Sequence, residues 1–223
     1  MGILKESIAV GMKMAIKLST LGMPCRHSFS RHGMYRQIED FAASLPSRHG
    51  RILDISSSMH LASVIGLDPS EVTSLAYPDY TIFNIPYPDN HFDWIVSDQC
   101  FEHLEGQPID AIHECLRVLK PGGRMLHTTC FMTAYHGGGG LGDFWRFSPE
   151  GLSLLCRDAT EVTAKGSGHP LSNLLNSFIG WSMVPSKRWH PLTRLAELNH
   201  RGHPAMVWVY ARKPLLGSDA TSR

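Results

Sequence analysis

A glycine-rich segment carries the side chains best suited to acid–base chemistry. It reads HGGGGLGDFWRF and contains an imidazole at His136, a carboxylate at Asp143 and a guanidinium at Arg146. Histidine titrates near neutral pH, so His136 is our candidate for the general base of a reaction that removes a proton from its substrate. The glycine run allows a loop that can approach a ligand closely. We expect Asp143, Trp145 and Arg146 to contact that substrate.

Several of these aromatic and basic residues also have a structural interpretation. Trp145 is equally suited to anchoring the following helix in the core, and Arg146 to a salt bridge or a carbonyl contact. His127 lies in an apolar strand pattern typical of a buried, hydrogen-bonded core residue, and His103 is better explained as a loop-shaping residue. The chain has 13 histidines, and those at 103, 113, 127 and 136 lack a metal-ligand spacing such as H-E-x-x-H. The sequence therefore predicts no metal centre.

A second group of polar residues follows the apolar run FDWIVSD at 92–98. Ser97, Asp98 and Gln99 should lie at the carboxyl end of that buried strand, the edge at which open α/β sheets bind small ligands. An amphipathic helix follows, with apolar residues at Ile109, Ile112, Leu116 and Leu119. The turn PGG at 121–123 should end this helix before a second buried strand, RMLHTTCF, begins. The segment is therefore one parallel strand–helix–strand unit.

The other expected elements repeat this alternation. Strands are predicted at RILDIS (51–56), EVTSLAY (71–77) and AMVWVYARK (205–213). Residues 1–50 have a helical pattern, with a break at Gly22–Pro24 and a second helix at 34–45 that Pro46 ends. Ser148 and Pro149 are a suitable N-cap and first residue for a further helix. Alternating strands and helices predict an open, mostly parallel α/β sheet.

Three segments in this order, NIPYPDNHFD, FEHL and RVLKPGG, resemble the middle of the class I S-adenosylmethionine-dependent methyltransferases of type 11. The run from His136 to Leu152 resembles the segment H-x(n)-D-[YF]-W-R-[FY]-[ST]-P-E-G of a branch linked to glycan and natural-product modification. The resemblance covers roughly Arg51 to Thr163. It implies a Rossmann-like seven-stranded sheet with helices on both faces, S-adenosyl-L-methionine as cofactor, and an enzyme of class EC 2.1.1.

The resemblance also assigns cofactor contacts along the carboxyl edge of the sheet. The implied cofactor-binding residues are Asp54, Ser56, Ser58, Asp79, Asn84, Ile85, Asp98 and Gln99. The glycine-rich loop of the family is replaced here by ISSSMH, which departs from the pattern. Serine still permits a tight turn, but a left-handed backbone would cost more at His60 than at glycine.

Two acidic residues compete for the ribose hydroxyls of the cofactor. A carboxylate suits that role because it accepts two hydrogen bonds at once. Asp79 follows the expected second strand and is preferred. Asp68, in VIGLDPS, would require residues 63–67 to be the strand instead, and D-P-S is also a common turn or helix cap.

The function implied is methyl transfer to a small-molecule, natural-product or sugar-containing acceptor, with O-methylation favoured. The alternative is a catalytically degenerate methyltransferase-fold protein that acts as a binding or regulatory partner. A nicotinamide dehydrogenase is disfavoured because G-x-G-x-x-G is absent after the first strand. We expect residues 1–50 to form a helical cap on a domain at 51–214. Insertions around 132–147 and 166–203 should form the lid and acceptor pocket, and 215–223 a mobile tail.

Composition and net charge limit the partners and the cellular compartment that we expect for this chain. The 223 residues are 43% apolar, and 21 basic against 20 acidic residues give a net charge of +1, so no nucleic-acid partner is indicated. Five widely spaced cysteines without a C-x-x-C pair fit a reducing cytoplasm. The basic amphipathic N-terminal helix could contact a membrane surface, but such helices more often pack on their own domain. Nothing in the sequence indicates the oligomeric state.

Overall fold

The computed structural model describes residues 2–45, 48–55, 59–138, 140–179 and 182–215. Its main sheet has the strand order β3-β2-β4-β5-β8-β6. The strands are β2 (Ile52–Asp54), β3 (Val72–Ser74), β4 (Phe92–Asp98), β5 (Leu119–Cys130), β6 (Thr160–Ser167) and β8 (Met206–Arg212). β3, β2, β4 and β5 pair in parallel, and β8 runs antiparallel to both β5 and β6. The mostly parallel α/β sheet is confirmed, with six strands among the described residues where seven were expected.

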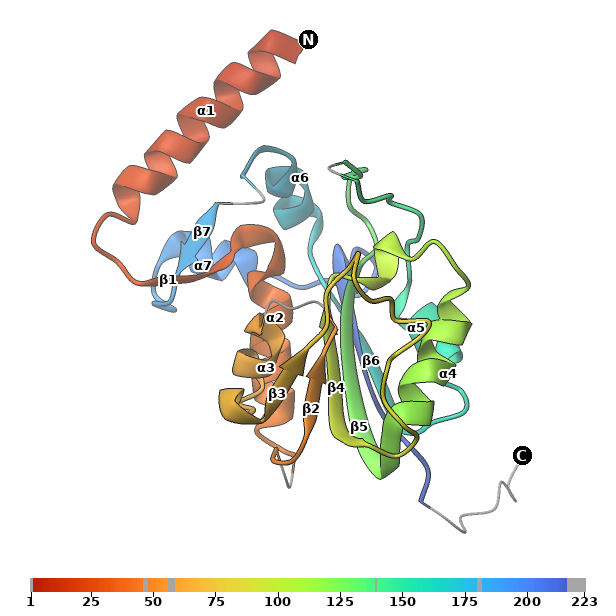
Figure 1. The fold of residues 1–223 in the computed structure, drawn as a ribbon. Coiled ribbons are helices and arrows are strands. Elements are labelled where there is room, and N and C mark those ends of the chain that lie inside the picture. Colours follow the sequence, from red (N-terminus) through yellow and green to blue (C-terminus); the bar gives the residue numbers. More distant parts are fainter. Residues whose placement is uncertain (1, 46–47, 56–58, 139, 180–181, 216–223) are drawn as a thin grey trace.

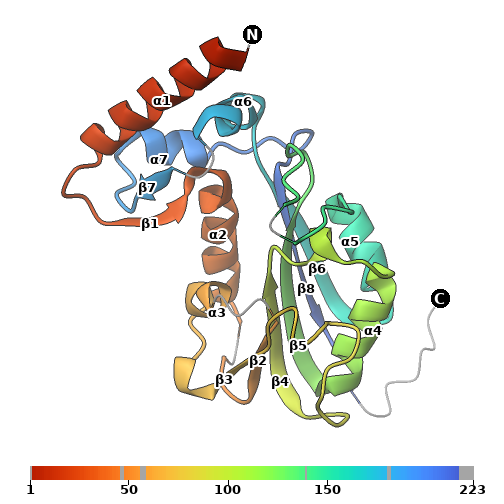
Figure 2. The ribbon, with the colours of Figure 1, turned by 45° about the horizontal axis from the view of Figure 1, so that its top comes forward.

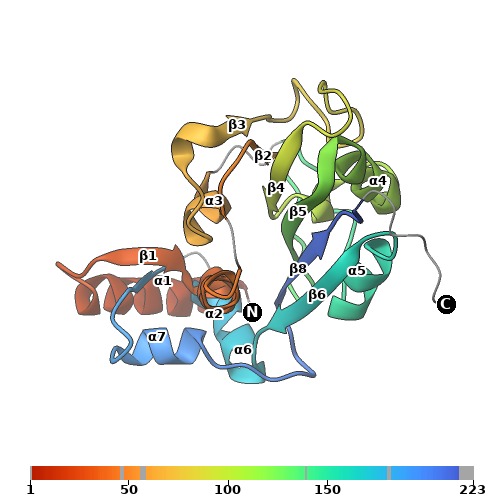
Figure 3. The same cartoon turned by 90° about the horizontal axis from the view of Figure 1, so that it is seen from below.

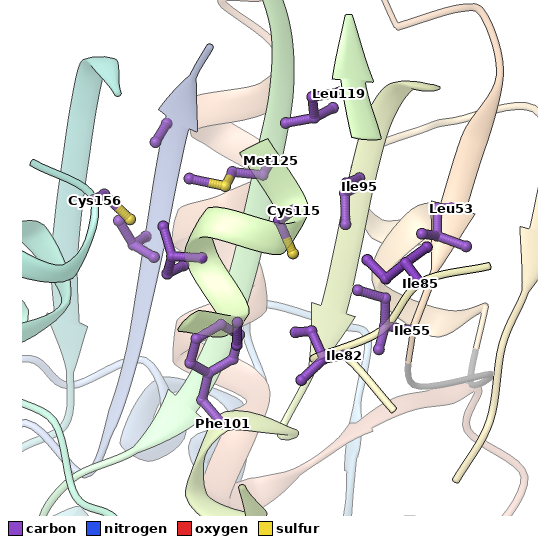
Figure 4. Close-up of a cluster of buried hydrophobic side chains, with 14 of the residues drawn as sticks. Leu53, Ile55, Ile82, Ile85, Ile95, Phe101, Cys115, Leu119, Met125 and Cys156 are labelled. Atoms are coloured by element: carbon purple, nitrogen blue, oxygen red, sulfur yellow. The ribbon is translucent and has the colours of Figure 1, made fainter. Parts of the chain in front are cut away.

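Helices cover both faces of this sheet (Figure 1). α2 (Phe29–Ala42) and α3 (His60–Val64) lie on one face, and α4 (Pro108–Val118) and α5 (Pro149–Leu155) on the other. Figure 3 shows the two layers edge-on. Alternation along β4 explains the two cores: Trp94 and Val96 pack toward α2, while Ile95 packs toward α4 (Figure 4).

Local sequence signals explain where several elements begin and end. Ser148 caps α5 by accepting a hydrogen bond from the Gly151 amide at 3.0 Å, as predicted. The PGG segment was expected to be a separate turn, but it lies inside β5. The pairing of β4 with β5 shifts register between Phe92 and Trp94, and Gly122 has a φ of +75°, so the glycines form an irregularity in a continuous strand. Pro46 lies outside the described residues.

A second, smaller unit lies beyond the carboxyl edge of the main sheet (Figure 2). It contains α1 (Gly2–Ser19), α6 (Pro170–Ile179), α7 (Pro191–Ala196) and the antiparallel strands β1 (Cys25–Ser28) and β7 (Met183–Pro185). We call it the cap. Two short 3-10 helices, η1 (Pro69–Glu71) and η2 (Phe101–His103), complete the described elements. The two cap strands, β6, α6, α7 and the two 3-10 helices were not predicted, and α2 starts at Phe29 rather than at residue 34.

The N-terminal helix α1 packs on the cap with one side. Met12 and Ile16 contact the cap core of Phe29, Ile179 and its neighbours, while Val10, Met14 and Leu18 are exposed. None of the helices in the described part of the chain combines the length and hydropathy that a bilayer crossing requires.

Candidate active site

Four strand ends meet at one edge of the sheet and bring the predicted polar residues together. Asp54 of β2 pairs with Ser74 of β3 on one side and with Val96 of β4 on the other. Asp98, two residues further along β4, pairs with Thr128 of β5. The parallel register therefore places the strand acid Asp54 and the tip residue Asp98 at the same edge, as predicted.

The loop after β2 is closed by the strand acid itself. Asp54 is 1% exposed, and its Oδ2 accepts a hydrogen bond from the Met59 amide at 2.7 Å. Met59 has a φ of +51°, so in the described part of this loop the left-handed residue is Met59, one position before the residue for which we expected the strain. His60 begins α3 instead. Ser56 and Ser58 lie outside the described residues, so their cofactor role stays a prediction.

Asp98 is held by residues from two other elements. Tyr35 of α2 donates its hydroxyl to Asp98 Oδ2 at 2.7 Å, and Thr128 donates to Oδ1 at 2.6 Å. Burial, and then the charge of Asp98, raise the pKa of Tyr35, so its hydroxyl keeps its proton and remains a donor. Gln99 follows with a φ of +54°, and its amide donates to Thr128 Oγ1 at 3.0 Å. The β4 tip is therefore a rigid, hydrogen-bonded platform.

The acid proposed for the ribose follows β3 at the protein surface. Asp79 is exposed in the turn after this strand, and Asn84 is exposed five residues later. The strand that Asp68 would require is absent, because His60–Val64 form α3, and Asp68 caps η1 by accepting from the Ser70 amide at 2.9 Å. That alternative strand assignment is wrong; the ribose role of Asp79 stays a prediction.

Ile85 is a core residue rather than an open contact. Its side chain is 2% exposed and lies among the apolar residues drawn in Figure 4. Its amide donates to Glu114 Oε1 of α4 at 2.8 Å. A cofactor contact through the backbone of Ile85 would have to compete with this bond, and the predicted contact remains untested.

Residues 131–147, which we call the His136 loop, bring three of the predicted residues together. The His136 amide donates to Asp143 Oδ2 at 2.9 Å, and the ring atom Nδ1 lies 3.2 Å from the Ala134 carbonyl and 3.5 Å from Asp143 Oδ2. Arg146 donates through both terminal nitrogens to the two oxygens of Asp143. This fork, and then the His136 contacts, lower the pKa of Asp143, which is therefore ionised near neutral pH.

Trp145 does not join this group. Its ring nitrogen donates to the Leu104 carbonyl at 2.8 Å, and its ring stacks on Phe147 at an interplanar angle of 17°. It packs against the core cluster on the α4 side. The geometry matches the alternative interpretation, a core anchor, and contact with a substrate remains an untested prediction.

A buried carboxyl group lies beside the His136 ring. Glu102 of η2 is 0% exposed; its Oε2 accepts from Thr129 at 2.7 Å, and its Oε1 has no hydrogen-bond partner within the described part of the chain. The distance from Glu102 Oε1 to His136 Nε2 is 4.0 Å. Burial raises the pKa of Glu102. The sequence interpretation missed this residue, although an acid four positions past a buried strand end was a usable signal.

The other two histidines discussed above have structural contacts. His127 is 1% exposed and lies 2.8 Å from the Ser97 hydroxyl, and burial lowers its pKa to about 3. His103 Nδ1 contacts the Gly142 carbonyl and so ties η2 to the His136 loop. These contacts are those of a core residue and a loop-shaping residue.

A cavity of about 340 Å³ joins the strand tips to the cap. Its wall includes Gln99 at the tip of β4, Cys130 at the end of β5, His136, and residues of α1, α2 and α6. A wider hollow of about 1060 Å³ lies between α2, β6 and the start of α5, and none of those predicted site residues that the structure describes line it. The smaller cavity is therefore the one that the sheet edge and the His136 loop share.

Comparison with known proteins agrees with this geometry. Residues 46–127 match the family model described as a methyltransferase domain. The matched segment is 82 of the 223 residues, and over it the predicted family resemblance is confirmed. A methyltransferase domain implies an enzyme of class EC 2.1.1 with S-adenosyl-L-methionine as its cofactor, as predicted. No curated protein matches the chain.

Several solved structures are similar to this chain. The complex of the Haloferax volcanii Trm112 methyltransferase activator with a putative methyltransferase has a TM-score of 0.51 and 14% identity, covering 83% of this chain and 90% of that one. A possible histamine N-methyltransferase from Thermotoga maritima has a TM-score of 0.48 and 17% identity, covering 84% and 90%. A putative sarcosine dimethylglycine methyltransferase from Galdieria sulphuraria has a TM-score of 0.48 and 17% identity, covering 82% and 85%.

Proposed function

We propose that this methyltransferase methylates an oxygen of a small-molecule, natural-product or sugar-containing acceptor that binds in the 340 Å³ cavity. The observation that carries the proposal is the position of that cavity. It connects Gln99, at the strand tip where the cofactor is expected, with His136 on the opposite loop. An acceptor in this space would lie between a cofactor on the sheet edge and the titratable residues of the loop.

The chemistry of the sheet edge fits the cofactor. S-adenosylmethionine presents hydrogen-bond donors, namely an ammonium group, two ribose hydroxyls and the adenine amine, and carboxylates are acceptors. Asp79 is exposed and free to accept both ribose hydroxyls, while Asp98 lies in the platform beside the cavity. Asp54 shapes the loop between them by binding the Met59 amide. When bound, the cofactor supplies a methyl group on a positively charged sulfur, which is an activated leaving group.

The cavity wall supports a polar acceptor. Asn173 and Asn176 of α6 line it. Their side-chain amides contain hydrogen-bond donors and acceptors, so a ligand with hydroxyl groups suits this wall. Arg31 and Lys13 add positive charge to the same cavity. A hydroxyl-rich molecule such as a sugar satisfies these groups better than an apolar one.

An oxygen acceptor must lose its proton as the new bond forms. We place this step where His136 meets the cavity, because His136 is the histidine that lines it. The side chain of Asp143 holds the ring from the opposite side. The residues of the chain therefore align the acceptor, exclude water beneath the cap and provide the group on which deprotonation depends.

Calorimetric titration with S-adenosylhomocysteine tests the cofactor half of the proposal. Asp79→Ala should weaken binding by at least about tenfold, since it removes a charged acceptor of two hydrogen bonds. Asp68→Ala is the matched control, because Asp68 is an exposed acid that caps η1, and it should bind like the wild type. The reverse result would move the ribose site to Asp68.

A second candidate function is a degenerate methyltransferase-fold protein that regulates a partner. The observation that favours it is the run ISSSMH where the family has glycines. The same titration separates the two functions. Absence of S-adenosylhomocysteine binding by the wild-type protein at millimolar ligand would overturn the methyl-transfer proposal.

A further inference from the structure

Three potential metal ligands from separate elements converge beside the acceptor cavity. One ligand atom each from Glu102, Cys130 and His136 lies within 4.8 Å of the other two. Glu102 belongs to η2, Cys130 ends β5, and His136 lies on the loop that follows it. Motif spacing could not predict this group, because Cys130 lies 28 positions after Glu102 and 6 positions before His136. The three residues come together only when β4 and β5 pair.

Glu102 supplies an oxygen that the protein leaves open. The side chain is fully buried, and Thr129 donates to Oε2, which fixes the direction of the carboxyl group. Among the described residues, Oε1 has no hydrogen-bond partner, and it lies on the side of His136 Nε2. A buried carboxyl oxygen without a partner carries a desolvation penalty, which a bound cation would offset.

His136 is oriented as metal-binding imidazoles are. Its Nδ1 side faces the Ala134 carbonyl and Asp143, both of which accept hydrogen bonds. The proton is therefore best placed on Nδ1, which leaves the Nε2 lone pair on the side of Glu102 Oε1. Arg146 in turn fixes Asp143 with a two-pronged contact. A carboxylate behind the ring is the usual outer support of a metal-bound histidine.

We propose that Glu102, Cys130 and His136 bind a divalent cation of the zinc type and leave one coordination position open toward the acceptor cavity. A carboxylate, a thiolate and an imidazole are ligands that zinc accepts, and three protein ligands with one open position are typical of catalytic zinc. Cys130 and His136 both line the cavity, so the open position would face the acceptor. Two anionic ligands would also neutralise the charge of the buried ion.

The inference rests on the proposed function for the place of the acceptor, and it makes His136 a ligand rather than the general base. Cation binding releases the Cys130 thiol proton to solvent. The acceptor hydroxyl then takes the open position, where the positive charge lowers its pKa and its proton leaves to cavity water. Its oxygen lone pair forms the C–O bond to the methyl group as the methyl–sulfur bond breaks, and S-adenosylhomocysteine keeps the bonding pair.

Cobalt(II) titration of the chelator-treated full-length protein tests the site without turnover. The wild type should bind one equivalent and develop both d–d absorption and a thiolate-to-cobalt charge-transfer band. Cys130→Ser should lose the charge-transfer band. His136→Ala and Glu102→Gln should each weaken cobalt binding by at least about tenfold. Loss of an outer support alone weakens metal binding by about that factor, so loss of a ligand should cost at least as much. Glu102→Gln keeps the shape of the side chain, so it still tests the site if the Cys130→Ser variant does not fold.

Matched controls remove a thiol or an imidazole elsewhere. Cys25→Ser changes a thiol of β1, and His113→Ala changes a half-exposed imidazole that pairs with Asp158. Both should bind cobalt like the wild type. A missing thiolate band, or one that survives in folded Cys130→Ser, would overturn the metal site. S-adenosylhomocysteine binding is measured on the same samples as an independent readout. If the wild type does not bind S-adenosylhomocysteine, the proposed function is overturned. If it binds S-adenosylhomocysteine but not cobalt, only the metal site is overturned.

Discussion

Two carboxyl groups flank the His136 ring, and their surroundings separate their pKa values. The Arg146 fork lowers the pKa of Asp143, while burial raises the pKa of Glu102. Asp143 is therefore a fixed negative charge that orients the ring, and Glu102 is the group whose ionisation needs a further positive charge. Such separated pairs mark sites of acid–base or cation chemistry.

Replacement of His136 tests the importance of this residue for turnover. His136→Ala should lower kcat by about a hundredfold, because either role, base or ligand, supports removal of the acceptor proton. S-adenosylhomocysteine affinity should stay near that of the wild type, because the proposed role of His136 is toward the acceptor and not toward the cofactor. His113→Ala is the control in the same steady-state assay. An unchanged kcat for His136→Ala would reject the assignment.

The titratable residues of the His136 loop could be predicted from the sequence, but the residues that lie beside them in the fold could not. His136, Asp143 and Arg146 could be chosen from the sequence because charged and titratable side chains stand out beside a glycine run. Cys130 could not, because a cysteine at the end of an apolar strand is normally a small hydrophobic residue. Its closeness to Glu102 arises from the pairing of β4 with β5, which spacing along the chain does not reveal.

At the scale of elements, side chains of α4 hydrogen-bond to the backbone of the turn that leads into β4. Glu114 accepts the Ile85 amide, and Arg117 donates to the carbonyls of Ile85 at 3.0 Å and Tyr87 at 2.9 Å. Arg117 also binds Glu114 itself at 2.8 Å and Asp89 at 2.7 Å. One helical turn of α4 thus satisfies the backbone of a segment that has no strand partner of its own.

Loss of Arg117 should therefore be costly. Arg117→Met keeps the length of the side chain but removes every donor, and we expect a loss of about 1–3 kcal/mol in the free energy of unfolding by urea. Arg157→Met, at an exposed position of the same residue type, should change it by less than about 0.5 kcal/mol. Asp89→Asn should also have a small effect because Asp89 is 69% exposed. Equal stability of Arg117→Met and the wild type would contradict this role.

The elements that were predicted correctly carry their signal locally. β4 and β8 are dense apolar runs, and α5 has its cap residues in sequence. β1 and β7 are different: Ser28 pairs with Met183, so each strand exists only because a segment about 155 residues away supplies its partner. Strands of three or four residues give too little periodicity to be seen without that partner.

At the scale of the whole molecule, the 340 Å³ cavity forms only where elements from distant parts of the chain meet. Its wall combines α1 and α2 from the N-terminal part with α6 from the later insertion and the tips of β4 and β5. The tips of β4 and β5 and the His136 loop lie within the family resemblance, whereas α1, α2 and α6, which complete the cavity wall, lie outside it. If the acceptor binds in this cavity as proposed, its specificity depends on tertiary contacts that no motif encodes.

Buried histidines should make the stability of the whole fold depend on pH. Burial lowers the folded-state pKa to about 3 for both His127 and His27, against an ordinary value of 6.5. Above pH 6.5 these rings are neutral in the folded and unfolded states alike. As the pH falls from 6.5 toward 3, the unfolded chain takes up protons that the folded chain rejects, so the free energy of unfolding decreases.

His127→Asn isolates one of these groups, because an asparagine amide can still meet the Ser97 hydroxyl that lies 2.8 Å from His127 Nδ1. Each pH unit below 6.5 costs the wild type about 1.4 kcal/mol per buried ring. The variant should therefore lose about 2 kcal/mol less stability than the wild type between pH 7 and pH 5, measured by urea unfolding. His113→Asn, at a half-exposed ring, should follow the wild type. Parallel pH profiles for His127→Asn and the wild type would show that His127 protonates in the folded state.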